Sequence, residues 1–240
     1  MLSKSQIKLI TSLKQKKYRQ QHGLFVVEGV KTIKELLASS LKLHALYTTE
    51  SFNIDAKLET IISPADLKRI SFLTTPNTAL AVFKRPEPKR IDSNNLIVAL
   101  DSVRDPGNLG TIIRLCDWFG IKDLVCSKET VDCFNPKVIQ ATMGSVTRVN
   151  INYVNLEEFI SSVDVPVFGA FMEGDNVYSS ELPNNGILVM GNEANGISHE
   201  IENLVTDKIS IPRFGDLQAT ESLNVATATA ILLSEFKRRS

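Results

Sequence analysis

The sequence predicts an α/β protein of two domains, the larger one built on a mostly parallel sheet with helices on both faces. Between residues 95 and 237, short apolar runs without polar alternation are interleaved with helical segments, which is typical of buried parallel strands. A smaller alternation of the same kind fills residues 1–83. Residues 84–90, "KRPEPKR", combine two prolines with alternating charges and separate the two parts. We therefore expect an N-terminal α/β domain over 1–83, a linker over 84–90 and a second domain over 91–240.

The N-terminal domain begins with a basic segment. Residues 1–22 contain six Lys and Arg and no acid, and Ile7, Ile10 and Leu13 recur at helical spacing, which predicts one basic amphipathic helix. Strands are predicted at 24–29, 41–49 and 78–84, and helices at 30–40 and 63–71. The second of these helices has Ser63 as its expected N-cap and Pro64 at its first position.

The second domain repeats the alternation over a longer stretch. Strands are predicted at 95–102, 122–127, 149–154, 166–172, 186–191 and 207–212, and helices around 109–119, 135–144, 155–163, 197–205 and 222–237. The last helix carries no charge from Ser222 to Ser234, so it belongs to a deep core or to a subunit interface.

Composition narrows the function classes. The net charge is zero, but residues 1–90 carry 16 Lys and Arg against 7 Asp and Glu, whereas residues 91–240 carry 11 against 20. This asymmetry suggests that the N-terminal part meets a polyanion. The three cysteines lack disulfide or zinc spacing, and no run is long enough to span a membrane. We expect a cytoplasmic protein with no metal and no membrane partner.

The stretch "ALDSVRDPGNLGTIIRLCDWFG", residues 99–120, resembles a dinucleotide-binding turn at first sight. Its glycines at 107, 110 and 120 do not have the required spacing, which argues against a nicotinamide-dependent oxidoreductase. Asn108 is instead a candidate helix cap. The helix that follows gathers its apolar residues on one face and turns Arg114 away from it, where Arg114 either pairs with Asp117 or serves the function. The apolar residues are Leu109, Ile112, Ile113, Cys116 and Phe119.

Two later stretches favour the functional interpretation. "GILVMGNEANGIS", residues 186–198, places a glycine-rich loop with Glu193 directly after an apolar strand, where ligand sites of parallel sheets lie. In "ISIPRFGDLQATESLNVATATAILLSEF", residues 209–236, a proline-containing loop leads to the charge-free helix, for which Ser222 is a possible N-cap. Asn224 falls inside that helix and needs hydrogen-bond partners if it is buried.

Taken together and in this order, the three stretches resemble the signature motifs of the SpoU/TrmH family of RNA ribose 2′-O-methyltransferases. The matching elements are Asn108-x-Gly110-x-x-x-Arg114, Gly191-x-Glu193-x-x-Gly196, and Ile211-Pro212 leading to Ser222-Leu223-Asn224. The N-terminal part also resembles the small RNA-binding domain of the family. The resemblance implies a deep trefoil knot in the second domain, a homodimer, and S-adenosylmethionine as cofactor.

The resemblance also implies roles for individual residues. Those expected at the reaction centre are Arg114, Asn108, Glu193, Ser222 and Asn224. Those expected around the cofactor are Gly191, Ile211, Leu223, Met190, Gly196 and Pro212, whereas the longer loop from Phe214 to Thr220 departs from the family pattern. RNA phosphates are expected to contact Lys14, Lys16, Lys17 and Arg19.

The implied reaction is methyl transfer to a ribose 2′-oxygen of structured RNA, with ribosomal RNA the expected substrate. Three alternatives stay open at this point. The chain could modify transfer RNA, it could methylate a base nitrogen instead of a ribose, or it could be a non-catalytic RNA-binding relative of the same fold.

Overall fold

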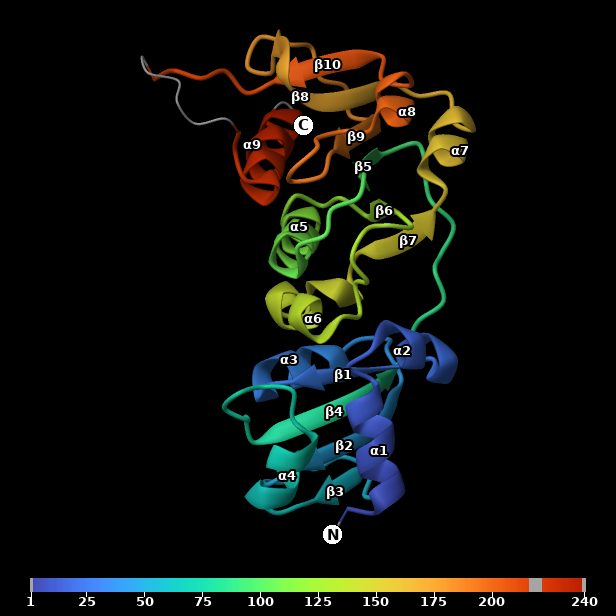
Figure 1. The fold of residues 1–240 in the computed structure, drawn as a ribbon, viewed down its shortest axis with the longest axis vertical. Helices are drawn as coiled ribbons and strands as arrows, with labels where there is room; N and C mark the ends of the chain where they lie inside the picture. The colour runs from blue at the N-terminus through green and yellow to red at the C-terminus, as the bar shows by residue number, and fades with distance from the viewer. Residues whose placement is uncertain (1, 216–221, 239–240) are drawn as a thin grey trace. The chain divides into compact units, whose positions relative to one another are not determined.

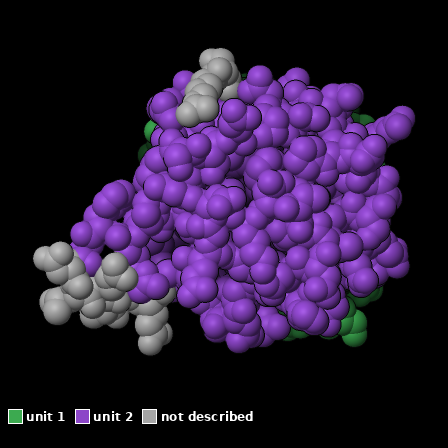
Figure 2. Space-filling view, turned by 90° about the horizontal axis from the view of Figure 1, so that it is seen from above, with its two compact units in different colours: residues 1–87, 132–147 green, residues 88–131, 148–240 purple. Residues whose placement is uncertain are grey.

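The computed structural model describes residues 2–215 and 222–238, which form two compact units. Unit 1 consists of residues 1–87 and 132–147, and unit 2 of residues 88–131 and 148–240 (Figure 2). The chain therefore passes between the units three times, after residues 87, 131 and 147. By sequence, residues 132–147 were expected in the second domain, but their contacts place them in unit 1.

Unit 1 is an α/β structure on a four-stranded sheet of order β1-β4-β2-β3, in which only the β2–β3 pair is parallel. Its elements are α1 (Lys4–Ser12), α2 (Lys16–His22), β1 (Leu24–Glu28), α3 (Val30–Leu37), β2 (Leu43–Thr48), β3 (Glu59–Ile61), α4 (Pro64–Ile70), β4 (Ala79–Lys84), α6 (Pro136–Thr142) and the 3₁₀ turn η1 (Ser145–Thr147). The Ser63 hydroxyl accepts a hydrogen bond from the Asp66 amide, which confirms the predicted cap of α4. The three-residue strand β3 was not predicted.

The basic N-terminal segment forms two helices rather than the single one predicted. Helix α1 ends at Ser12 and α2 begins at Lys16. The fully buried Leu13 lies in the turn between them. The Arg19 guanidinium donates 2.9 Å hydrogen bonds to the carbonyls of Leu13 and Lys14. Because these carbonyls are held by a side chain, the turn replaces the continuation of α1.

Unit 2 contains a six-stranded sheet of order β10-β8-β9-β5-β6-β7, and every neighbouring pair is parallel. Its elements are β5 (Leu96–Leu100), α5 (Pro106–Trp118), β6 (Asp123–Ser127), β7 (Asn150–Val154), α7 (Leu156–Ser161), β8 (Val167–Asn176), β9 (Gly186–Met190), α8 (His199–Glu202), β10 (Asp207–Ser210) and α9 (Val225–Lys237). Helices α5 and α9 pack together on one face, and α7 and α8 lie on the other (Figure 1). The predicted α/β class with a parallel sheet is confirmed.

Each unit has its own apolar core. In unit 2, Ile97, Ala99 and Val125 lie in one buried cluster with Ile187 and Val189, which explains why these strands are apolar without alternation. The predicted apolar face of α5 is confirmed, since Leu109, Ile112, Ile113 and Cys116 are buried and Phe119 is half-buried. Within the described residues, no helix combines the length and apolar character that crossing a membrane requires.

Candidate active site

The site is built where two neighbouring parallel strands end. Leu100, the last residue of β5, lies opposite Met190, the last residue of β9. The Asp101 amide donates a 2.9 Å hydrogen bond to the Met190 carbonyl, so the pairing continues one step beyond the sheet. The loops that follow the two strands therefore start side by side, at the edge where parallel sheets bind ligands.

The loop after β9 closes on itself. Asn192 and Gly196 exchange backbone hydrogen bonds of 2.8 and 2.9 Å, and the Asn192 side-chain oxygen accepts from the amides of Ala194 and Asn195. Gly196 has a φ of +69°, which favours glycine. A Cβ atom at Gly191 would overlap the backbone of Gly196 and Ile197, so the closed loop leaves room only for glycine at 191.

Side chains bind this loop to the loop after β5. The Asn192 side-chain amide donates a 2.6 Å hydrogen bond to the Ser102 carbonyl. The Ser198 amide donates a 2.7 Å hydrogen bond to the buried Asp101 carboxylate. Two segments about 90 residues apart are therefore held in one arrangement, and Asp101 is a positioning residue that the sequence reasoning missed.

Glu193 completes this connection. Its carboxylate accepts hydrogen bonds from the backbone amides of Arg104 (3.3 Å) and Asp105 (3.2 Å) and from the side-chain amide of Asn108 (3.0 Å). Partial burial raises the pKa of Glu193, but the hydrogen bonds from Asn108 and the backbone outweigh it, so the pKa lies below its ordinary value. Glu193 is therefore the charged acceptor that holds the start of α5.

Asn108 links this arrangement to the third stretch of the sequence. Its side-chain oxygen accepts a 2.8 Å hydrogen bond from the Asn224 side-chain amide. The Asn224 side-chain oxygen in turn accepts from the amides of Ala226 (2.9 Å) and Thr227 (3.2 Å). Glu193, Asn108 and Asn224 thus form one chain of hydrogen bonds, which we call the amide network. Three segments far apart in the sequence converge there.

Two predicted helix caps are wrong. Asn108 does not cap α5, because Asp105 lies at the N-cap and accepts a 2.8 Å hydrogen bond from the Asn108 amide. Ser222 does not cap α9, because Asn224 is the N-cap rather than a residue inside the helix. The first shift leaves the side chain of Asn108 available for the amide network, and the second lets Asn224 cap α9 with its oxygen while its amide donates to Asn108. An Asp directly before Pro106 was the available sign of the first cap.

Arg114 is exposed on α5 and lies outside the amide network. Its expected alternative partner, Asp117, pairs with Arg148 at 2.8 Å instead. In the described part of the chain, the Arg114 guanidinium makes no ion pair or hydrogen bond. Helix geometry places it about 9 Å along the axis from Asn108 and about 120° around it. In the described residues, neither Asn108 nor Glu193 forms a hydrogen bond with Arg114, although all three are expected at the reaction centre.

The remaining predicted site residues differ in how deeply they are buried. Met190 is buried, and Ile211 and Pro212 are half-buried just after β10. Ser222 and Leu223 directly precede Asn224 and are exposed, Leu223 to 47% although it is apolar. Of the longer loop from Phe214 to Thr220, residues 216–220 lie outside the described residues. Phe214 itself is exposed, and its ring stacks on Tyr178 with a centroid distance of 6.5 Å.

Three of the four basic residues predicted to bind RNA lie on the surface of unit 1. Lys14, Lys16 and Lys17 are exposed. Arg19 is not, since its side chain is only 2% exposed and pairs with Asp132 at 2.6 Å. The prediction that Arg19 contacts RNA phosphates is corrected here, because its guanidinium is buried and four of its five N–H donors already bind protein atoms.

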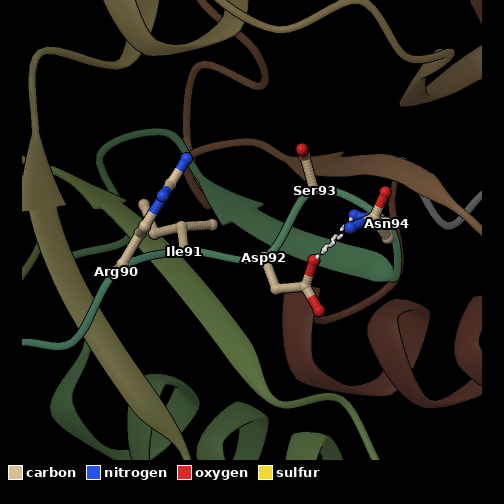
Figure 3. A pocket seen from close by; sticks show the side chains of 5 residues that line it. All are labelled: Arg90, Ile91, Asp92, Ser93 and Asn94. Carbon is tan, nitrogen blue, oxygen red and sulfur yellow. Dashed lines mark hydrogen bonds between the residues drawn. The ribbon is translucent and has the colours of Figure 1, made fainter.

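A hollow of about 390 Å³ lies elsewhere in unit 2. It is lined by Arg90, Ile91, Asp92, Ser93 and Asn94, where Asp92 accepts hydrogen bonds from Asn94 (Figure 3). These residues precede β5, so they lie at the opposite strand end from the amide network. Within residues 2–215 and 222–238, no group of three or more His, Cys, Asp or Glu side chains has the arrangement of a metal site.

Comparison with known proteins identifies the class. Residues 95–234 match the SpoU rRNA Methylase family, and residues 4–81 match the MRM3-like substrate binding domain. The chain belongs to the SpoU rRNA methylase family.

Three similar proteins align with this chain over nearly its whole length. The 23S rRNA (guanosine(2553)-2′-O)-methyltransferase RlmP of Bacillus subtilis is 29% identical over 228 residues, which cover 91% of this chain and 90% of RlmP. A Porphyromonas gingivalis structure assigned to the TrmH family of RNA methyltransferases is 41% identical, covers 100% of both chains and has a TM-score of 0.91. An AdoMet-bound rRNA methyltransferase from Sinorhizobium meliloti is 31% identical, covers 100% of this chain and 97% of its own, and has a TM-score of 0.88.

Proposed function

We propose that this protein transfers a methyl group from S-adenosylmethionine to a ribose 2′-oxygen of ribosomal RNA. The observation that carries the proposal is the amide network, because it joins all three family motifs through side-chain hydrogen bonds. The relatives support the substrate, since one of them is named as a 23S rRNA 2′-O-methyltransferase and covers nine-tenths of the chain.

The loops around the network fit the proposed cofactor. Gly191 and Gly196 leave the two ends of the loop after β9 without side chains, and Leu223 presents apolar surface that an adenine ring could cover. We assign cofactor binding to Gly191, Gly196, Ile211, Pro212 and Leu223, with Met190 as buried support. When bound, S-adenosylmethionine supplies an activated methyl group on a sulfonium, so the protein mainly provides alignment.

Arg114 is the residue we assign to the RNA at the reaction centre. A guanidinium keeps its proton in proteins, so we assign it charge stabilisation rather than proton abstraction. It would bind the phosphate beside the target ribose through two hydrogen bonds and stabilise the negative charge that develops on the 2′-oxygen. Ser222 and Asn224 would donate or accept hydrogen bonds near that oxygen, with Asn108 and Glu193 holding Asn224 in place.

The separation of Arg114 from the network supports a homodimer in which each Arg114 serves the partner's site. The guanidinium is exposed and unpaired in the described residues, and it lies on the helix that packs beside the charge-free part of α9. We further propose that the C-terminal segment is threaded as a trefoil knot, as the SpoU resemblance implies. The three buried free cysteines are consistent with a cytoplasmic protein.

We assign RNA affinity to unit 1, which contains the expected N-terminal domain of residues 1–83, and catalysis to unit 2, which contains residues 91–131 and 148–240 of the expected second domain. Lys14, Lys16 and Lys17 are exposed on the net positive N-terminal part, which supports contacts with phosphates.

The deciding experiment maps ribose methylation across total RNA from cells with and without the protein, and then repeats the mapping with purified protein, S-adenosylmethionine and unmodified ribosomal RNA. A single ribosomal ribose that gains its methyl group only with the protein supports the proposal. Methylation of a base nitrogen, of transfer RNA alone, or of nothing in the purified reaction would refute it.

A further inference from the structure

The turn after α1 and helix α2 carry a basic surface with aromatic rings on it. We define the α2 surface as Lys14, Lys17, Tyr18 and His22. Both lysines and His22 are exposed, and Tyr18 is half-buried. No acidic residue occurs in the first 22 positions of the sequence, so positive charge there is not balanced locally. Such a surface attracts a polyanion.

The two rings of this surface lie one helical turn apart and nearly parallel. The ring centroids of Tyr18 and His22 are 6.4 Å apart with an interplanar angle of 19°. The Lys17 amine lies 5.9 Å from the centre of the Tyr18 ring. Helix α2 ends at His22, with Gly23 as its C-cap, and apart from its chain neighbours no described atom lies within 4 Å of the position that a Cβ at Gly23 would take. The backbone that follows the two ring-bearing residues is therefore open on that side.

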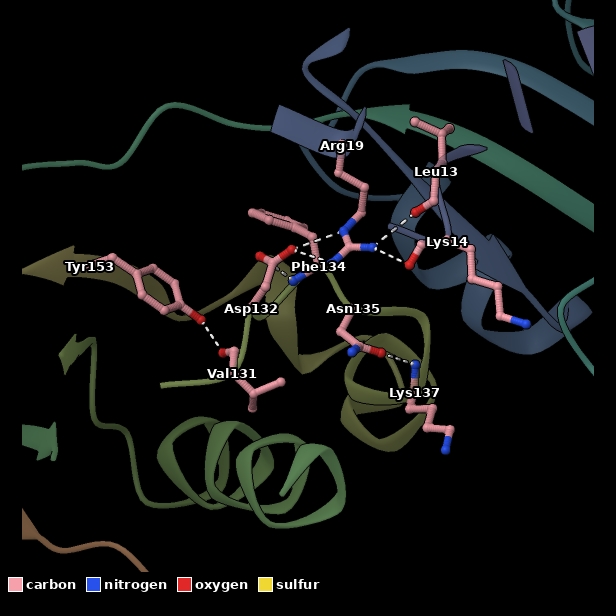
Figure 4. A network of polar contacts seen from close by, with 9 residues as sticks. All are labelled: Leu13, Lys14, Arg19, Val131, Asp132, Phe134, Asn135, Lys137 and Tyr153. Carbon is pink, nitrogen blue, oxygen red and sulfur yellow. Dashed lines mark hydrogen bonds and ion pairs between the residues drawn. The ribbon is translucent and has the colours of Figure 1, made fainter. Parts of the chain in front are cut away.

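A buried ion pair between Arg19 and Asp132 holds helix α2 in place. The Arg19 guanidinium donates to the Asp132 carboxylate at 2.6 and 2.9 Å, and to the carbonyls of Leu13 and Lys14 (Figure 4). In the same view, the Lys14 amine points away from this pair. The turn and the helix are thus held in one geometry, so the backbone that carries the exposed side chains is in place before any ligand binds.

We propose that the α2 surface binds an unpaired stretch of RNA, with one base stacked on the Tyr18–His22 rings and flanking phosphates on Lys14 and Lys17. Aromatic side chains stack on bases that are not paired, and lysines neutralise the phosphates on either side. An acidic peptide would use the lysines but would gain nothing from the flat rings, so RNA is the partner that uses the whole surface. This inference rests on the proposed function and adds the residues that recognise the RNA strand.

The test compares two labelled strands of equal length and charge, a short oligoadenylate and a ribose-phosphate strand without bases. We expect the full-length protein to bind the oligoadenylate more tightly, and Tyr18→Ala to weaken that binding about tenfold while leaving the base-free strand unaffected. Gln21→Ala, an exposed change on the same helix, is the matched control. Equal binding of both strands by the unaltered protein, or an unchanged preference in Tyr18→Ala, would overturn the proposal.

Two further measurements guard against a folding artefact. Lys17→Gln should reduce the slope of log affinity against log salt, whereas Tyr18→Ala should lower affinity at every salt concentration with the slope unchanged.

Tyr18→Trp, made with Trp118→Phe to leave one reporter, should retain binding, and its fluorescence should respond to oligoadenylate but not to the base-free strand. No response despite binding would refute stacking. Methylation by the unaltered protein is measured separately, so loss of this inference is distinguishable from loss of the proposed function.

Discussion

The side-chain amide of Asn224 donates a 2.8 Å hydrogen bond to the side-chain oxygen of Asn108, 116 residues earlier in the chain. Each asparagine also has a second task, since Asn224 caps α9 and Asn108 donates to Glu193. The start of one helix is thereby held against the start of another, and the loop after β9 is held against both. This relationship makes Asn108 the central residue of the site.

Replacing Asn108 should therefore disable the site more than a change elsewhere on the surface. Asn108→Ala removes both side-chain hydrogen bonds, and we expect a fall in kcat of about 100-fold, since loss of a positioning contact costs a few kcal/mol of transition-state stabilisation. Asn108→Asp should be worse, because it places a second carboxylate opposite Glu193. Gln140→Ala, an exposed amide on α6, is the control and should keep normal kcat.

Arg114→Ala should abolish turnover while S-adenosylmethionine binding, measured by calorimetry, stays nearly unchanged. The reason is that the proposed function assigns Arg114 to the RNA and the developing charge rather than to the cofactor. Arg114→Lys should recover little, because an ammonium does not reproduce the planar, two-bond contact with phosphate. Normal turnover by Arg114→Ala would remove Arg114 from the mechanism.

Co-expression of Arg114→Ala with Asn108→Ala tests the shared site. If Arg114 serves the partner's site, mixed dimers contain one site with both changes and one intact site. Random pairing should then restore about a quarter of normal activity from two inactive proteins. If Arg114 serves its own chain, every site in every dimer keeps one defect and no activity returns.

Gly191→Ala should destabilise unit 2, because the added Cβ overlaps the backbone of Gly196 and Ile197. We expect a loss of about 1–3 kcal/mol, as for overpacking in a core, visible as a lower Tm. Gly196→Asn is the comparison, since its Cβ meets no described atom within 4 Å and asparagine tolerates a positive φ. A Gly191→Ala protein as stable as Gly196→Asn would contradict the close packing.

Acid should weaken the loop interactions through Glu193. Because its folded-state pKa lies below the ordinary 4.5, its hydrogen bonds contribute stability above pH 4.5, and that stability is lost as pH falls through the folded-state value. Thermal unfolding should show a Tm difference between the unaltered protein and Glu193→Gln that is constant near neutrality and shrinks below about pH 4.5. A difference that grows on acidification would reverse the assignment.

Breaking the buried Arg19–Asp132 pair should destabilise unit 1. Arg19→Met leaves a buried carboxylate without its cation, at a cost of about 3–5 kcal/mol. Adding Asp132→Leu should recover part of that loss, because the uncompensated charge is gone. Denaturant unfolding of the unaltered protein, the two single variants and the double variant gives the coupling free energy between Arg19 and Asp132. A coupling free energy near zero would show that the pair does not stabilise unit 1.

Much of this arrangement was predictable from the sequence. The apolar strands of unit 2 and the three motifs could be recognised because burial on both faces leaves uninterrupted apolar runs, and because loops after parallel strands meet at one edge. The N-cap of α5 was harder to predict, because Asp105 and Asn108 both suit the start of a helix. Only the hydrogen bond from the Asn108 side chain to Glu193, a tertiary contact, distinguishes the residue that caps the helix from the one that joins the amide network.

The burial of Arg19 could not be predicted from composition. In a segment of six basic residues and no acid, every cation appears alike by composition, and burial of one of them depends on Asp132, 113 residues away. The break between α1 and α2 follows from the same side chain. Neither the burial of Arg19 nor the break between α1 and α2 leaves a pattern in the local sequence. Both depend on Asp132, which follows the unit 2 segment 88–131 in the chain.

The three passages of the chain between the units limit how the protein could be divided or recombined. A graft cut within residues 84–90 would carry Arg19 away without Asp132 and without α6, which packs on β1. The grafted piece would then bury the Arg19 guanidinium without a counter-charge and would expose the face of β1 that α6 covers. Specificity in this lineage is therefore expected to be exchanged by changing surface side chains of the N-terminal unit rather than by trading that unit as a block.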